Sequence, residues 1–421
     1  MKLHFMLRYL FNKERFSWAL YDWANGAFWT TVVAGFFPIF FKSYWASDLD
    51  GPSSSAVLGT TNSIAGFCIV LMAPILGTIA DKAGAKKNFL VFFALLGIIA
   101  TGLFFFIPNG FWITASVLFG ISLLGGSGSN IFYDSLIVDV SDEKKRNIVS
   151  GFGYGLGYLG GGILFVFNVL FYLYPAWFGF ENEVQAILVS FLTVSIWWFV
   201  FTVPLFLNVQ EQKPSTKTKR LIRNSFKELI NTISNISKYK NITIFLVAYW
   251  LYIDGVDTIT RMSVAYGSDI GLEASSMITA LIVVQFIAFP SAIIYGYLAE
   301  RYGQFLFLSI GIVAYILITI NAYFMETSKD FYTLAVGIGL VQGGVQSVSR
   351  AIFSKMVPPE KVAEFFGFYN FVGKSAVVFG PVLVGWIAYL TGDPKNGIFS
   401  LLLLFIPGLI VLLLVPKSKQ I

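Results

Sequence analysis

Between two long apolar segments the chain reads Gly77-Thr-Ile-Ala-Asp81-Lys82-Ala-Gly84-Ala-Lys86-Lys87. A related stretch, Gly296-Tyr-Leu-Ala-Glu300-Arg301-Tyr-Gly303-Gln304, follows at an offset of 219 and is also flanked by apolar segments. Each copy places an acid and a base at the end of an apolar segment, followed by a glycine that suits a tight turn. A hairpin repeated at half the length of the chain predicts two homologous helical bundles.

The composition indicates a polytopic membrane protein. The chain has 421 residues, of which 56% are hydrophobic and 12% charged, whereas soluble proteins are about 25% charged. His4 is the only histidine and Cys68 the only cysteine, so an intramolecular disulfide and histidine-based catalysis are excluded. We expect no enzyme, catalytic residue, cofactor or metal, no nucleic-acid partner, and a monomer embedded in the lipid bilayer.

Apolar segments of about 20 residues are long enough to cross a membrane. We expect an all-α membrane protein with twelve transmembrane helices in two pseudo-symmetric six-helix bundles, and three parts: residues 1–207, a linker over 208–240 and residues 241–421. Within the linker, apolar residues at helical spacing predict an interfacial amphipathic helix. The expected spans are 17–43, 57–80, 88–108, 111–138, 149–173, 184–207, 241–264, 273–298, 305–325, 331–354, 365–390 and 396–415.

The basic residues predict the orientation. If both termini are cytoplasmic, 24 of the 29 lysines and arginines fall in the termini or in inner loops and span ends. Cytoplasmic loops of membrane proteins carry such an excess. Further repeats support the six-plus-six layout, since Gly125-Gly126 corresponds to Gly343-Gly344 at an offset of 218, and Gly151-Phe152 to Gly367-Phe368 at an offset of 216. The glycine-rich run 151–162 predicts close helix packing.

Ionisable residues inside apolar spans are candidates for function, because a charge at the bilayer centre costs roughly 2.5–3.5 kcal/mol. Asp254 lies about 20 Å into the seventh expected span, and Lys374 about 13 Å into the eleventh. Asp254, Asp257 and Arg261 share one helical face. Asp257 and Arg261 either neutralise each other or contribute to a site. Lys374 either receives a substrate carboxylate or pairs with an acid such as Asp254 or Asp22.

Other polar residues leave two interpretations open. Asp22 is either an acid near the inner interface or a proton-titrating or substrate-orienting group at the cavity floor. Gln285 and Gln346 either line a cavity or bond to neighbouring helices. Late in the fourth span, Asp134 and Asp139 are expected to pair with residues of the following loop, namely Lys144, Lys145 and Arg146, and Arg350 is expected to have the same kind of role.

The repeated hairpin is either a turn anchored by basic residues or a gate latch. Gly77 permits close approach of another helix, and Asp81 is suited to accept hydrogen bonds from the N-terminus of a neighbouring helix or to pair with a base across the interface. We expect a latch that stabilises one of two access states. Its residues are Gly77, Asp81, Lys82, Gly84, Lys86, Lys87, Glu300 and Arg301.

The hairpin resembles the signature of the major facilitator superfamily, and four further segments resemble the vacuole effluxer family of autophagy-related vacuolar amino-acid exporters and bacterial relatives. These segments are Ser17-Trp18-Ala-Leu-Tyr21-Asp22-Trp23-Ala24-Asn25-Gly26-Ala27-Phe28, the run 150–160, Leu251-Tyr252-Ile253-Asp254-Gly255-Val256 and Phe366-Gly-Phe-Tyr369-Asn370-Phe-Val-Gly373-Lys374. The resemblance implies a twelve-helix transporter and amino-acid efflux. Because the chain lacks the longer loops of the fungal members, we expect a bacterial inner membrane. Asp254 departs from the family pattern, in which asparagine is common.

These observations predict a proton-linked secondary transporter for a small zwitterionic solute such as an amino acid or short peptide. Lys374 would receive the carboxylate of the solute, and Asp254 its amine or the coupling proton. The remaining candidates for substrate binding or proton coupling are Asp22, Asn25, Asp257, Arg261, Gln285, Gln346 and Tyr369. The alternatives are an exporter or flippase of larger amphiphiles (a lysolipid or cell-wall fragment) and a non-transporting membrane receptor.

Overall fold

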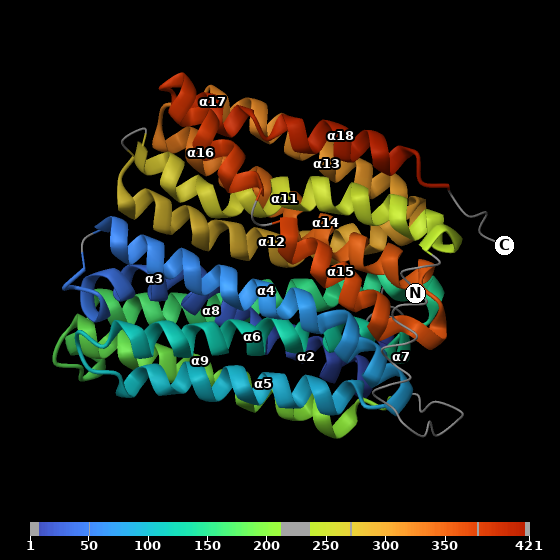
Figure 1. The fold of residues 1–421 in the computed structure, drawn as a ribbon, viewed down its shortest axis with the longest axis horizontal. Helices are drawn as coiled ribbons and strands as arrows, with labels where there is room; N and C mark the ends of the chain where they lie inside the picture. The colour runs from blue at the N-terminus through green and yellow to red at the C-terminus, as the bar shows by residue number, and fades with distance from the viewer. Residues whose placement is uncertain (1–7, 50, 212–235, 270–271, 377–378, 417–421) are drawn as a thin grey trace.

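A computed structural model describes residues 8–49, 51–211, 236–269, 272–376 and 379–416, and all regular secondary structure within these ranges is helical (Figure 1). Eleven segments within them are helical, long and apolar enough to cross a membrane. The remaining expected span, 365–390, is covered by two shorter helices, α15 and α16, described below. The all-helical fold predicted from the apolar segments is confirmed.

The N-terminal half contains six long helical segments. The first of them is interrupted by π-helical turns at Phe28–Phe36 and Phe41–Trp45 on either side of α3. Its helices are α2 (Lys13–Ala27), α3 (Phe37–Phe40), α4 (Gly51–Ala83), α5 (Lys86–Leu103), α6 (Trp112–Ser135), α7 (Ile137–Val140), α8 (Arg146–Leu173) and α9 (Glu183–Asn208).

The C-terminal half contains a corresponding series of helices. Its helices are α11 (Lys240–Asp269), α12 (Ala274–Tyr302), α13 (Gln304–Tyr323), α14 (Ser328–Met356), α15 (Val362–Ala376), α16 (Phe379–Thr391), α17 (Pro394–Phe399) and α18 (Leu402–Leu413). We expected one helix over 365–390; the structure describes α15 up to Ala376 and α16 from Phe379, and residues 377–378 lie outside the described residues. The third residue of α16 is Pro381, which has no backbone N–H to continue a preceding helix and is favoured in a first turn.

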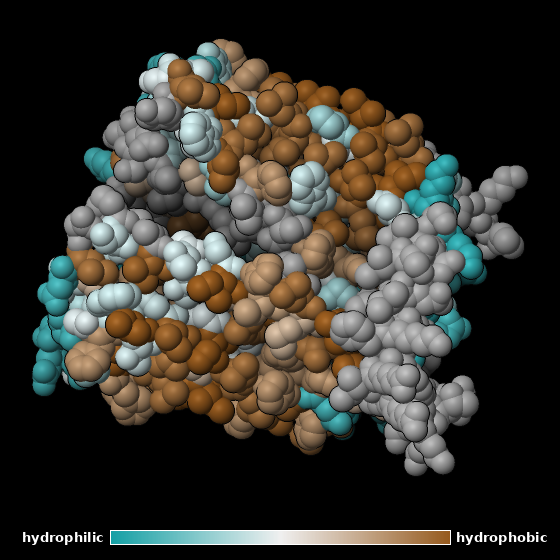
Figure 2. Space-filling view, in the orientation of Figure 1, coloured by the Kyte–Doolittle hydropathy of each residue, from teal (hydrophilic) through white to brown (hydrophobic). Residues whose placement is uncertain are grey.

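The halves meet chiefly along two pairs of helices, α8 with α12 and α4 with α15, and α14 also packs against α8 and α15 against α6. We call the end where α4 turns into α5, and α12 into α13, the hairpin end, and the other the opposite end. In Figure 1 the hairpin end lies on the right. Figure 2 shows a largely apolar flank, with a hollow between the two halves toward the opposite end.

The glycines of α8 bring the halves into close contact. A Cβ atom at Gly151 would lie 2.5 Å from the carbonyl oxygen of Ala292 on α12, and one at Gly155 would lie 2.9 Å from that of Phe289. Small residues at such a crossing let two helix backbones approach and slide past each other. The close packing expected for the run 151–162 is therefore present. Gly151 and Gly155 face α12 across the interface between the halves, whereas Gly157 and Gly160 approach α2 of the same half.

The described part of the linker adjoins the first hairpin. Backbone N–H groups of Lys86 and Lys87, at the N-terminus of α5, donate to the two carboxylate oxygens of Glu211 at 2.7 and 3.2 Å. Burial raises the pKa of Glu211 above its ordinary value, while these hydrogen bonds and Lys86 oppose the shift. The expected amphipathic helix falls mainly on 212–235, which lies outside the described residues.

Candidate functional site

Arg350 on α14 is a buried charge in the interface between the halves, with a residue exposure of 1%. Its Nη1 lies 3.0 Å from Oδ1 of Asp134 on α6. Its Nη2 lies 3.5 Å from Oδ2 of Asp22 on α2. One guanidinium of the C-terminal half therefore faces two carboxylates of the N-terminal half. The expected pairing of Asp134 with the loop after it is wrong: its ionic partner is Arg350, which approaches from another helix.

Arg350 also bonds to α8. Its Nε donates to the Ser150 hydroxyl at 2.9 Å and its Nη2 to the Ser150 carbonyl at 3.1 Å. The guanidinium lies 4.2 Å from the ring centroid of Tyr154, within the range of a cation–π contact. A buried ion pair of this kind is costly to break from one side, by about 3–5 kcal/mol, because the remaining charge stays buried without a partner. Arg350 therefore joins the two halves in this conformation.

Asp22 and Asn25 lie on neighbouring turns of α2 and both face α6. The Tyr133 hydroxyl donates to Oδ2 of Asp22 at 2.7 Å, and the amide of Asn25 donates to that of Asn130. The indole of Trp18 stacks on Tyr133 with ring centroids 4.5 Å apart. Asp22 thus faces the protein interface, which favours the cavity-floor interpretation over that of an acid held at the membrane surface.

Two amide side chains cross the interface farther from the hairpin end. Gln285 on α12 donates to the hydroxyl of Thr30 at 2.6 Å. The hydroxyl of Tyr158 on α8 donates to Gln346 on α14 at 2.8 Å. Tyr369 lies on α15 and stacks on Tyr249 with ring centroids 4.1 Å apart. Both glutamines therefore bond to the other half, and Tyr369 packs within its own half.

Asp254 is buried in the C-terminal half, with an exposure of 1%. Its Oδ1 accepts a hydrogen bond from the backbone N–H of Gly380 at 3.0 Å and a longer one from the Thr258 hydroxyl at 3.4 Å. Among the groups that the structure describes, none donates to its Oδ2. Asp254 therefore binds the N-terminal end of α16, where exposed N–H groups favour an anion.

Three other candidates are placed only in part. Asp257 is half-buried one turn from Asp254 on α11. Arg261 lies on α11 and Lys374 on α15, but both side chains fall outside the described residues. Two expected pairings therefore remain predictions: that of Arg261 with Asp257, and that of Lys374 with an acid.

The two hairpin acids make equivalent contacts with the opposite half. Asp81 accepts backbone N–H groups of Ala363 and Glu364, at the N-terminus of α15, at 3.0 and 2.9 Å. Glu300 accepts the backbone and side-chain N–H groups of Asn147, at the N-terminus of α8, at 3.0 and 2.9 Å. Lys355 lies 3.1 Å from Glu300. Each acid thus binds the N-terminus of a helix in the other half. A negative charge is favourable there, because the unpaired N–H groups and the helix dipole present positive charge.

The other hairpin residues support these contacts. Gly84 and Gly303 have φ angles of 59° and 116°, which side chains rarely adopt. A Cβ atom at Gly77 would overlap the carbonyl group of Ala363. The basic residues are placed as follows: Lys86 Nζ lies 3.2 Å from Asp139 and 3.8 Å from Asp81, Lys87 donates to the Val209 carbonyl at 2.8 Å, Lys82 is half-buried, and Arg301 is exposed beside the ring of Tyr302.

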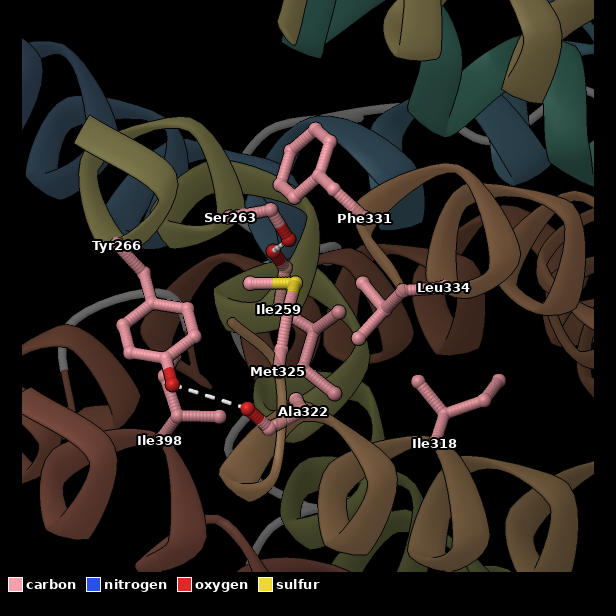
Figure 3. A pocket seen from close by; sticks show the side chains of 9 residues that line it. All are labelled: Ile259, Ser263, Tyr266, Ile318, Ala322, Met325, Phe331, Leu334 and Ile398. Atoms are coloured by element: carbon pink, nitrogen blue, oxygen red, sulfur yellow. Dashed lines mark hydrogen bonds between the residues drawn. The ribbon is translucent and has the colours of Figure 1, made fainter. Parts of the chain in front are cut away.

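An enclosed pocket lies elsewhere, within the C-terminal half (Figure 3). Side chains of α11, α13, α14 and α17 line it, and the hydroxyl of Tyr266 donates to the carbonyl of Ala322, at 2.9 Å. Its walls are apolar, so it does not suit a charged solute. In the described ranges, no three histidine, cysteine or acidic residues lie close enough together to hold a metal ion.

Sequence patterns did not predict that Arg350 pairs with acids of the other half, nor the contacts of Tyr133, Ser150, Asn147 and Gly380. One signal was available, because Arg350 follows Asp134 at the same offset that separates Gly367 from Gly151. The acid and the base thus occupy corresponding positions in the two halves. No comparable pattern marks the hydroxyl and backbone partners.

Comparison with known proteins agrees with this architecture. Residues 52–421 match the family described as "Vacuole effluxer Atg22 like". The chain is 42% identical over 412 residues to an uncharacterized MFS-type transporter, YxiO, of Bacillus subtilis, covering 97% of this chain and 96% of that protein. It is 26% identical to autophagy-related protein 22-1 of Neosartorya fischeri over 67% of this chain, which spans 51% of the fungal protein.

Solved structures share the fold. The MFS proton:xylose symporter XylE superposes with a TM-score of 0.75 at 11% identity, over 98% of this chain and 97% of that one. At this identity the likeness shows the fold alone, and it confirms the major facilitator architecture expected from the repeated hairpin.

Proposed function

Since the chain belongs to the vacuole effluxer Atg22-like family of major facilitator transporters, we propose that it is a proton-linked secondary transporter that works by alternating access. One observation carries the proposal: Arg350 of one half is held deep in the interface by Asp22 and Asp134 of the other half. Such charges within membrane-spanning helices mark ion and substrate pathways.

The two ends of the molecule support alternating access. At the hairpin end, Asp81 and Glu300 join the halves through helix N-termini. Toward the opposite end, the surface between the halves is hollow (Figure 2). In our proposal the structure is the state that opens at the opposite end, and the hairpin residues form the latch that closes the other end. The hairpin end and both termini face the cytoplasm of a bacterial cell.

The solute in this proposal is small and zwitterionic, such as an amino acid or a short peptide. Lys374 receives its carboxylate, and Asp254 receives its amine or the coupling proton. Asp254 suits either role, because its Oδ2 is buried and no described group donates to it. The amides of Gln285 and Gln346, together with Asn25 and Tyr369, supply polar and aromatic surface. Asp22, Asp257 and Arg261 are the remaining charged candidates.

Solute identification comes first. Purified protein is screened by thermal shift against amino acids, short peptides and nucleosides at two pH values, because a ligand that binds the folded state raises its apparent stability. Uptake of the solute found is then measured in proteoliposomes with and without a pH gradient.

We expect the gradient to accelerate uptake by the unaltered protein but not by Asp254→Asn, which keeps the size and the Gly380 contact of the side chain while removing its charge. Asp330→Asn is the matched control, since Asp330 is an acid of the capping box of α14. Equal gradient dependence in Asp254→Asn and the unaltered protein removes Asp254 from the coupling role. Uptake that ignores the gradient in every variant removes proton coupling altogether.

A further inference from the structure

The cluster around Arg350 contains more negative than positive charge. Two carboxylates, those of Asp22 and Asp134, face one guanidinium. The other described titratable groups that face the cluster are Tyr21 on α2, Tyr133 on α6 and Tyr154 on α8, all neutral as phenols. When both acids are ionised, the cluster carries one unbalanced negative charge in a buried site, and one proton would neutralise it.

The two acids are not equivalent. Asp134 lies closer to Arg350, at 3.0 Å, and its second oxygen has the amide of Asn370 at 3.5 Å. Asp22 lies 3.5 Å from Arg350, and its side chain is 17% exposed, compared with 11% for Asp134. The weaker ion pair and the greater exposure both favour Asp22 as the carboxylate that a proton reaches and neutralises.

Opening of the hairpin end would change this balance. All the described hydrogen bonds of the Arg350 guanidinium go to the N-terminal half, to α2, α6 and α8. Moving α14 away from that half therefore leaves Asp22 and Asp134 near each other without their common cation. Like charges in such a site disfavour joint ionisation, so the open arrangement binds a proton more tightly than the closed one.

We propose that Asp22 is a proton-binding residue whose protonation releases Arg350 and opens the hairpin end. By linkage, a proton that binds the open arrangement more tightly must shift the population toward it. The inference rests on the proposed carrier function and adds to it a named link between proton binding and the interface. It requires neither the solute nor Asp254, so its test uses neither.

The test measures opening through a buried cysteine. Ser354 on α14 is 1% exposed, and its carbonyl accepts a hydrogen bond from Arg146 of the other half at 2.9 Å. Ser354→Cys is introduced after Cys68→Ser, and its alkylation by a water-soluble maleimide is followed in nanodiscs from pH 8 to pH 5.5. Because the thiolate is the reactive form, each rate is divided by that of the unfolded protein at the same pH.

We expect the normalised rate to rise by about 5- to 150-fold as the pH falls, the range typical of coupling between two sites. Asp22→Asn should be reactive at every pH, with the pH dependence lost. Asp134→Asn should keep a pH dependence whose midpoint lies at lower pH. In that variant Arg350 pairs with Asp22 alone, which favours the ionised form of Asp22. Asp142→Asn is the matched control: this acid bonds to Tyr9 at the protein surface and should leave the response unchanged.

Ser122→Cys separates opening from unfolding. Ser122 is buried on α6 and bonds to the carbonyl of Phe119, as Ser354 bonds to that of Ala351. Its cysteine should stay unreactive throughout. A pH response that survives in Asp22→Asn, that disappears equally in both acid variants, or that is shared by Ser122→Cys overturns the proposal. None of these results bears on gradient-driven uptake, so the two proposals fail separately.

Discussion

At the scale of single residues, Asp254 shows how a buried carboxylate is held in an apolar helix. Its Oδ1 accepts the backbone N–H of Gly380 and approaches the Thr258 hydroxyl. A Cβ atom at Gly380 would lie 2.7 Å from this oxygen and would overlap the hydroxyl of Thr258. Glycine at position 380 is therefore needed for the approach of α16 to α11, and not for an unusual backbone conformation.

We therefore expect Gly380→Ala to destabilise the protein by about 1–3 kcal/mol, the usual cost of overpacking. Gly385→Ala is the matched control on the same helix, because a Cβ atom there meets nothing within 4 Å. That control should be neutral or slightly stabilising, since alanine is the better helix former. Thermal unfolding in detergent measures both changes, and equal midpoints for the two variants would contradict the packing argument.

At the scale of helices, the two hairpins act as one device applied twice. Asp81 holds the N-terminus of α15 and Glu300 that of α8, so each half donates an acid to a helix of the other. The ends of α15 and α8 are themselves related by the repeat, since Val362 corresponds to Arg146 at the offset that relates Gly367 to Gly151. The contact at one hairpin alone would leave the second helix N-terminus without its acid.

Closure at the hairpin end depends on the missing side chain of Gly77. We expect Gly77→Ala to oppose closure by about 1–3 kcal/mol, since the added methyl group would overlap the Ala363 carbonyl. The alkylation rate of Ser354→Cys should rise accordingly, by roughly tenfold for each 1.4 kcal/mol. Gly66→Ala on the same helix is the matched control, because it meets nothing within 4 Å. A rate unchanged in Gly77→Ala would show that α4 and α15 part without cost.

At the scale of the whole molecule, the orientation in the membrane remains a prediction from charge. Asn109 lies at the opposite end and Lys144 near the hairpin end, and both are exposed. In intact bacterial cells, an impermeant maleimide should label Asn109→Cys and not Lys144→Cys, each made after Cys68→Ser. Opening the cells should make both reactive, which serves as the control for expression. The reverse pattern would invert the orientation and place the latch outside.

The helical membrane fold, the expected twofold repeat and the two hairpins could all be predicted from the amino-acid sequence. These features follow from local rules: apolar length sets a span, glycine permits a turn, and a nearly constant offset relates one half to the other. The same offset joins Asp134 to Arg350, but a repeat alone does not say which corresponding residues face each other across the interface.

The partners of the buried charged residues follow from the packing of the helices and could not be predicted from the sequence. Arg350 binds Asp22 and Asp134 because α14 packs against helices that belong to the other half of the chain. Asp254 binds Gly380 because α11 packs against α16, whose second residue is Gly380. Both contacts join groups from different helices that packing brings together. The periodicity of apolar residues within one helix predicts which face is buried, but not which residue of another helix lies opposite.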